Sequence, residues 1–173
     1  MHIQNLTLQN FKCFENLEIG FHPNLTVVVG VNGAGKTSVL EGAAIALSTL
    51  FVKMYGLSSR RIDESQAHLK MFSIGSTKDV QGQYPVTIKA SAEMWENEIS
   101  WTRSLNRPAG NTTVIDARKL IDLSIYIQKQ LREGNTTLTL PIIAYYGTGR
   151  LWDYHREKQN DVFEINNRSN GYI

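Results

Sequence analysis

The sequence has one cysteine, little excess charge of either sign and no long apolar run. A single cysteine, Cys13, excludes an intrachain disulfide framework and fits a reducing compartment. Because free cysteine is usually a small buried hydrophobe, we expect Cys13 to lie in the interior and not to act as a nucleophile. The formal net charge of +2 does not by itself identify a nucleic-acid partner.

Two further absences concern membranes. No stretch approaches the roughly 20 apolar residues that a membrane-spanning helix needs, so no membrane partner is expected. The first residues, MHIQNLTLQNFKCF, lack the basic region and the apolar run of a signal peptide. The length of 173 residues suits one domain-sized unit. Together these features predict a cytoplasmic, globular chain.

What the sequence does contain is a glycine-rich stretch, VVVGVNGAGKTSVLE, at residues 27–41. Gly30, followed by Gly35-Lys36-Thr37, fits the phosphate-loop pattern G-x-x-x-x-G-K-[ST]. Glycines let the backbone curl around an anion, so that several N–H groups converge on a polyphosphate. The lysine adds a positive charge near the β- and γ-phosphates, and the threonine offers a hydroxyl to Mg²⁺. The predicted nucleotide-binding residues of the loop are Gly30, Asn32, Gly33, Ala34, Gly35, Lys36, Thr37 and Ser38.

The context of this loop supports nucleotide binding over an incidental glycine-rich turn. Before the loop, the apolar run at 25–29 predicts a buried strand of the kind found in parallel sheets. After it, apolar residues at three- and four-residue spacing predict a helix over Lys36–Val52. A phosphate loop opening a helix directs free N–H groups and the positive end of the helix dipole at its ligand. We therefore expect the chain to bind ATP.

The remaining elements are predicted from periodicity and turn residues. Alternating apolar and polar residues indicate a β-meander before the phosphate loop. A polar stretch, Gly56–Gln83, is predicted as loop with one helical turn near Glu64–Phe72. Alternation returns in a β-hairpin at 84–105. Residues 115–150 then read as a helix at 120–131, closed by Gly134-Asn135, and a buried strand at 138–150.

Three motifs near the amino terminus resemble a known family. They are Asn10-Phe11-Lys12-Cys13-Phe14, the Gly30–Thr37 loop with its internal Asn-Gly pair, and Leu40-Glu41-Gly42. This arrangement, over about the first fifty residues (1–55 with the helix), resembles the start of ATP-binding-cassette ATPases of the SMC/RecF/OLD group. The resemblance implies an α/β phosphate-loop NTPase fold. It also implies the amino-terminal lobe of such an ATPase, with a mixed sheet and an antiparallel β subdomain around the helix.

The same resemblance implies roles for three residues outside the glycines. Asn32 would lie on the γ-phosphate side of the nucleotide, or else supply turn geometry. Lys12 would approach the phosphates or the ribose, or else be a solvated charge at a strand end. The segment LPIIAYYGTGRLW, residues 140–152, resembles bacterial OLD-related and PtuA-like ATP-binding proteins, some linked to phage defence. There Arg150 stands near the place of the family's Q-loop glutamine, either as a sensor or as an arginine in a surface turn.

Hydrolysis also needs carboxylates that hold Mg²⁺ and orient the attacking water. In this ATPase group they follow a hydrophobic strand as an Asp-Glu pair. Asp116 follows only two strong apolar residues, and Asp122 lies within a predicted helix, so neither fits. The interpretation is that residues 1–173 form the amino-terminal part of one ATP-binding domain and that Lys36 is its catalytic residue, with the C-terminal half of the ATPase lying outside the sequence.

The predicted function is ATP binding with Mg²⁺ and, in a full-length form, ATP hydrolysis. By the resemblance, two copies would sandwich nucleotide as a homodimer and control DNA processing, a nuclease partner or phage defence. A phosphate-loop kinase and a non-catalytic, nucleotide-dependent interaction module remain as alternatives. A GTPase is disfavoured because no Asn-Lys-x-Asp tetrad is present and Asp79–Gly82 does not follow a hydrophobic strand.

Overall fold

The computed structural model describes residues 1–74, 77–95, 97–135 and 137–147. The chain divides into two units, Met1–Leu138 and Thr139–Ile173, and every helix and strand that the structure describes belongs to the first. Among these described helices, none combines the length and the apolar character needed to cross a bilayer.

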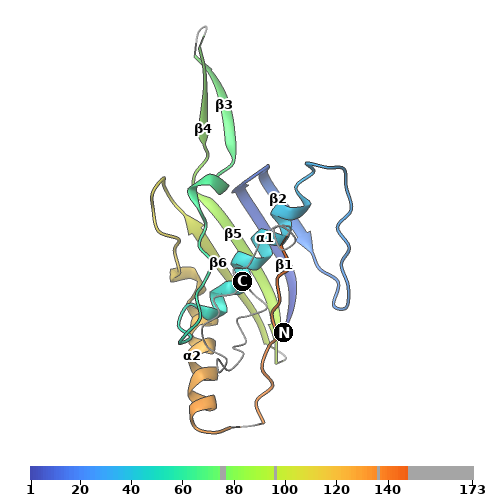
Figure 1. The fold of residues 1–173 in the computed structure, drawn as a ribbon, viewed down its shortest axis with the longest axis vertical. Coiled ribbons are helices and arrows are strands. Elements are labelled where there is room, and N and C mark those ends of the chain that lie inside the picture. The colour runs from blue at the N-terminus through green and yellow to red at the C-terminus, as the bar shows by residue number, and fades with distance from the viewer. Residues whose placement is uncertain (75–76, 96, 136, 148–173) are drawn as a thin grey trace, which may run out of the picture. The chain divides into compact units, whose positions relative to one another are not determined.

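A four-stranded antiparallel sheet forms the centre of the first unit (Figure 1). Its strands run in the order β2-β1-β5-β6, and the alternation of the sequence sets their register. Leu8, for example, lies opposite Leu17 on one side and Ile88 on the other. The meander before the loop and the hairpin at 84–105 correspond to these strands: β1 (His2–Phe11), β2 (Phe14–Gly20), β5 (Val86–Met94) and β6 (Asn97–Leu105).

Helix α1 (Lys36–Leu47) covers the apolar face of this sheet and packs against β1 and β5. It continues as a single 3₁₀ turn, η1 (Ser48–Phe51), so the helix predicted over 36–52 is present with a tightened end. The indole Nε1 of Trp101 donates a hydrogen bond to the carbonyl oxygen of Ala46 at 3.0 Å. Because this indole N–H is satisfied, the large ring is buried at little polar cost and fixes α1 on the sheet.

A second helix, α2 (Arg118–Arg132), follows the 3₁₀ turn η3 (Ile115–Ala117) and packs against η1 and β6. Its buried side chains are spaced for one face: Leu120, Ile121, Ser124 and Ile127. The helix ends as the sequence indicates, because Gly134 adopts φ 77° and Asn135 N–H donates to the carbonyl of Gln130 at 3.0 Å.

The segment 56–83 differs from its prediction. The helical turn is confined to η2 (Glu64–Gln66), and the residues beyond it form a two-stranded antiparallel ribbon, β3 (Leu69–Ile74) and β4 (Thr77–Gly82). Figure 1 shows this ribbon extending from the sheet. Its strands carry mostly exposed side chains, so hydrophobic alternation gave no signal for them. The Asp79–Gly82 stretch therefore lies in β4 and not in a nucleotide switch.

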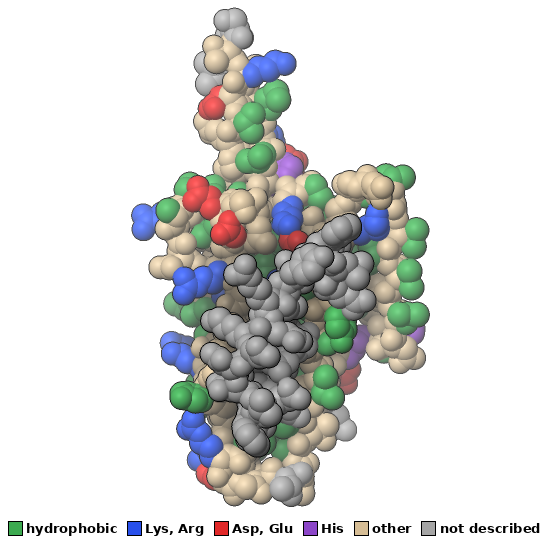
Figure 2. All heavy atoms as spheres, in the orientation of Figure 1, with side chains coloured by type: hydrophobic (Ala, Val, Ile, Leu, Met, Phe, Trp, Pro, Cys, Tyr) green, Lys and Arg blue, Asp and Glu red, His purple; other side chains and the backbone are tan. Residues whose placement is uncertain are grey.

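Two predicted strands are not formed in the described residues. The run Leu25–Val29 has no regular structure, and its side chains are largely exposed: Leu25 is 71% and Val29 87% exposed, while Val28 is half-buried. Figure 2 shows hydrophobic side chains at the surface of the molecule. Residues 138–147, the described part of the second predicted strand, are likewise irregular. Apolar composition suits a strand only where neighbouring strands pair with its N–H and C=O groups. All strand pairs in the described residues are antiparallel, and none involves these runs.

Candidate functional site

The phosphate loop leads directly into the first turn of α1. Gly33 and Gly35 both have positive φ, at 84° and 88°, which only glycine adopts without strain. Gly35 is the N-cap of α1, and no side chain caps the helix. The N–H groups of the first turn therefore remain available to an anion at the point where the helix dipole is positive.

The lysine of the loop points back onto the loop itself. Its Nζ donates to the carbonyl oxygens of Gly30 and Val31, both at 2.7 Å. Gly30 also packs closely, since a Cβ there would lie 3.2 Å from the Cβ of Ala34. These contacts hold the Lys36 ammonium over the concave side of the loop, within reach of any anion bound there.

A pocket of about 400 Å³ lies at this loop. Most of the predicted binding residues line it, which brings together side chains from the loop and from the β1–β2 turn. Gly30 and Ala34 belong to the loop but do not line the pocket, and Arg150 lies outside the described residues. The lining residues are Lys12, Cys13, Asn32, Gly33, Gly35, Lys36, Thr37 and Ser38.

The β1–β2 turn packs directly on the phosphate loop. A Cβ at Gly35 would lie 2.4 Å from Cζ of Phe14 and 2.5 Å from Sγ of Cys13. Gly35 is therefore required twice, by its backbone conformation and by these two side chains. The prediction that Cys13 is buried is wrong: it is exposed, because the tight turn directs it to the mouth of the pocket. Phe14 supports the loop, which explains its place in the motif.

Lys12 is held from several directions. Its backbone has φ 51°, its N–H donates to the carbonyl of Gln66 at 2.7 Å, and its carbonyl accepts from Nδ1 of His68 at 2.8 Å. Its Nζ donates to the carboxylate of Glu41 on α1. This contact of Glu41 was not predicted from the sequence, although Glu41 belongs to the Leu-Glu-Gly motif.

A second pocket of about 400 Å³ adjoins the first through Lys12. Glu41, Arg60 and Arg61 also line it. The backbone of Arg60 is fixed, because its N–H donates at 3.0 Å to Oγ of Ser48, a buried residue after the end of α1. The two pockets together form a largely positive surface around the loop.

A metal ion would find few protein ligands here. Among the described residues there is no group of three His, Cys, Asp or Glu side chains placed to hold a metal. Thr37 lines the phosphate pocket, and no described carboxylate does. This donor set suits a Mg²⁺ ion that takes most of its oxygen ligands from phosphates and water. Asp116 and Asp122 lie in η3 and α2, so neither ends a strand, as the sequence indicated.

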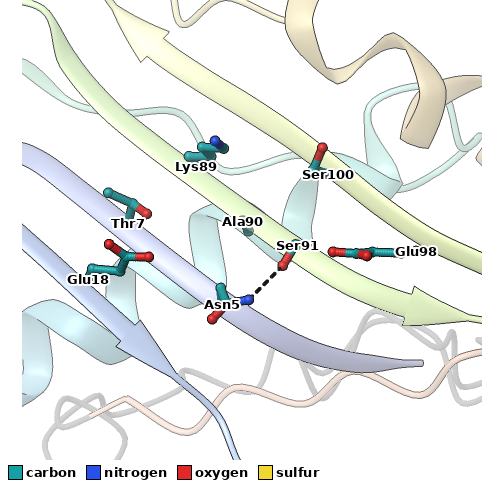
Figure 3. Close-up of a pocket in the computed structure, with 8 residues that line it drawn as sticks. All are labelled: Asn5, Thr7, Glu18, Lys89, Ala90, Ser91, Glu98 and Ser100. Carbon is teal, nitrogen blue, oxygen red and sulfur yellow. Dashed lines mark hydrogen bonds between the residues drawn. The ribbon is translucent and has the colours of Figure 1, made fainter.

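Another hollow, of about 290 Å³, lies on the polar face of the sheet (Figure 3). There Asn5 Nδ2 donates to Oγ of Ser91 at 3.2 Å. Lys89 is on β5, which lies in the sheet between β2, with Glu18, and β6, with Glu98. None of the described phosphate-loop residues lines it. It is the water-facing side of an antiparallel sheet whose other side is covered by α1.

Comparison with known proteins places this geometry in a family. The sequence matches the AAA domain family over residues 5–172. It is 24% identical over 170 residues to the Retron Vc95 probable ATPase of Vibrio cholerae, covering 95% of this chain and 31% of that protein. It is 46% identical over 41 residues to the DNA replication and repair protein RecF of Halalkalibacterium halodurans, covering 24% of this chain and 11% of RecF.

One solved structure, from work on ATP-driven dimerization and DNA-stimulated activation of SMC ATPases, is 18% identical. It covers 80% of this chain with a TM-score of 0.46. The matched region thus spans under a third of the retron ATPase and about a tenth of RecF. The chain belongs to the AAA domain family.

Proposed function

We propose that this chain binds ATP, as its Mg²⁺ complex, in the pocket at the amino terminus of α1. The observation that carries the proposal is the convergence of Asn32, Lys36 and Thr37 on that pocket, beside a helix start with no side-chain cap. A bound polyphosphate accepts hydrogen bonds from the free N–H groups of the first helical turn, and its negative charge neutralises the charge of Lys36.

Three of the lining residues then have defined roles. Lys36 exchanges the carbonyl oxygens of Gly30 and Val31 for phosphate oxygens, which are stronger acceptors because they are charged. The Thr37 hydroxyl provides the protein ligand of Mg²⁺, and phosphate oxygens and water provide the others. Asn32 lies on the same pocket, where its amide reaches the terminal phosphate.

In the longer protein, we infer an ATP-driven switch. Residues 1–173 would form the amino-terminal part of its ATP-binding domain, and two such domains would close on nucleotide as a homodimer. The names of the relatives support DNA as the partner, since RecF is a DNA replication and repair protein. The retron relative, a probable ATPase matched over 95% of this chain, supports hydrolysis. Control of a nuclease or of phage defence belongs to the same proposal.

The first experiment is equilibrium binding of Mg²⁺-ATP to the 173-residue chain and to Lys36→Ala. We expect the variant to bind at least about tenfold more weakly, because it loses a charge-assisted hydrogen bond to phosphate. Lys53→Ala is the matched control, since Lys53 is an exposed lysine just beyond η1 and lines none of the pockets described above. Equal affinity of Lys36→Ala and the native chain, with both folded by circular dichroism, would refute ATP binding at this loop.

Hydrolysis is tested separately, by steady-state release of phosphate from the same samples. Turnover that depends on Lys36 would mean that the residues needed for hydrolysis lie within this chain. Binding without turnover would support catalytic groups supplied from outside it. Formation of ADP that requires an added acceptor molecule, without release of free phosphate, would favour the kinase alternative instead.

A further inference from the structure

The backbone of Lys12 is strained, and the structure around it keeps it so. Its φ of 51° lies in the left-handed region, which is uncommon and unfavourable for a residue with a side chain. Two hydrogen bonds hold this conformation, one from the Lys12 N–H to Gln66 and one from His68 to the Lys12 carbonyl. Backbone strain that neighbouring hydrogen bonds maintain is concentrated at functional sites, which indicates that the direction of the Lys12 side chain is functionally important.

The side chain of Lys12 connects two sites. It lines the phosphate pocket and also the second pocket, while its ammonium contacts the carboxylate of Glu41. Glu41 lines only the second pocket. Both side chains are partly buried, at 29% and 23% exposure, so the pair is less screened than a surface ion pair. The carboxylate therefore holds the ammonium at the border of the phosphate site without entering that site.

We propose that Glu41 is a positioning residue, which holds the Lys12 ammonium where it meets the phosphates of a bound nucleotide. This inference rests on the proposed binding of ATP at the loop. Lys12 contacts the nucleotide, and Glu41 acts through Lys12 alone. The pair stays formed when nucleotide binds, with the ammonium using one N–H for Glu41 and another for a phosphate oxygen.

Two effects of Glu41 on nucleotide affinity oppose each other. Its negative charge repels phosphate, which weakens binding. Its hold on Lys12 removes the rotamer freedom of a long side chain before the nucleotide arrives, so less conformational entropy is lost on binding. Because Lys12 neutralises Glu41 and both arginines of the second pocket add positive charge, the repulsion is small. The positioning effect is therefore the larger one.

The test is a double-mutant cycle on Mg²⁺-ATP affinity with Lys12→Met, Glu41→Gln and both changes together. We expect Glu41→Gln to weaken binding about threefold in the native background, as a partly buried ion pair allows. In the Lys12→Met background, Glu41→Gln should leave affinity unchanged or tighten it, because only the repulsion is then removed. Glu15→Gln is the control, since it breaks an exposed ion pair with Lys70, at 2.8 Å, outside both pockets.

Other outcomes would overturn the inference. Unchanged or tighter binding by Glu41→Gln in the native background would show that the carboxylate only repels nucleotide. Equal weakening in both backgrounds, with a lowered melting temperature, would show a purely structural role. If neither Lys12→Met nor Glu41→Gln changes affinity while Lys36→Ala abolishes it, this inference fails and ATP binding at the loop stands. Glu41→Asp, which keeps the charge, should recover part of the lost affinity if the positioning role is correct.

Discussion

Gly42 of α1 lies against Leu8 of β1 so closely that a Cβ on Gly42 would stand 2.6 Å from Cδ2 of Leu8. Both residues are buried, and the contact sets how near the helix approaches the sheet. The glycine of the Leu-Glu-Gly motif therefore has a packing role, while the neighbouring glutamate faces Lys12. A Cβ at this position can be accommodated only if Leu8 shifts.

Gly42→Ala should accordingly destabilise the protein. Overpacking a filled core costs about 1 to 3 kcal/mol, and the better helix propensity of alanine returns up to about 1 kcal/mol. We expect a net loss of about 1 to 2 kcal/mol in urea unfolding. Leu40→Ala, at an exposed position of the same helix, should change stability less. A stability for Gly42→Ala equal to that of the native chain would mean that Leu8 moves aside freely.

Gly33 and Gly35 offer a matched pair of substitutions in the phosphate loop. Both have positive φ, but a Cβ at Gly33 meets nothing within 4 Å, whereas one at Gly35 overlaps Phe14 and Cys13. Gly35→Ala should therefore impair Mg²⁺-ATP binding more than Gly33→Ala, by at least about tenfold, because it adds a clash to the shared backbone strain. Isothermal titration of the two variants gives the comparison, and similar affinities would count against the packing of the turn on the loop.

Arg103 of β6 is 2% exposed and ties three segments together. Its Nε donates to the Thr113 carbonyl at 2.9 Å, and its Nη1 donates to the hydroxyls of Thr49 and Ser59, both at 3.1 Å. Arg103→Met should cost about 2 to 4 kcal/mol in urea unfolding, because buried acceptors lose charged donors. Lys89→Met, on the exposed side of β5, should cost little, so a comparable loss in both variants would contradict this account.

The exposed pair of Glu15 and Lys70 links β2 to the ribbon. The hydrogen bond and the charge of Lys70 lower the pKa of the Glu15 carboxyl below its usual value. A carboxyl with a lowered folded-state pKa stabilises the fold above its unfolded pKa, and this effect disappears as the pH falls through the folded-state pKa. Lys70→Ala should raise the pKa of Glu15, as measured by carbon-13 NMR titration of the carboxyl. An unchanged pKa would mean that the pair does not form in solution.

The sequence predicted best those elements whose pattern is local. Strands β1 and β2 alternate clearly, β5 and β6 form where the hairpin was expected, and α2 has both its apolar face and its glycine end. In each case the residues that bury the apolar side chains of the element lie within the same unit. The phosphate loop is similar, because its glycines and its lysine act through their own backbone and their own helix.

The errors concern pairing, which a local pattern does not contain. Leu25–Val29 is apolar enough for a buried strand, but a strand also needs a neighbouring strand to pair with, and no described strand pairs with it. The ribbon shows the converse, since β3 and β4 pair with each other although most of their side chains are exposed and β4 is largely polar. At the site, the contacts of Glu41 with Lys12 and of Phe14 with Gly35 join positions more than twenty residues apart. The spacing of these residues along the sequence does not predict such contacts.

Cys13, at the turn that supports the phosphate loop, gives the chain a built-in reporter. It is the sole cysteine in the sequence, its thiol is exposed, and its Sγ lies 3.9 Å from Oγ of Ser38 at the start of α1. A thiol-reactive fluorophore or mass tag therefore attaches once per molecule, at the edge of the pocket, with no engineering of the chain. The rate of that single labelling reaction, followed with increasing nucleotide, reads occupancy of the loop directly.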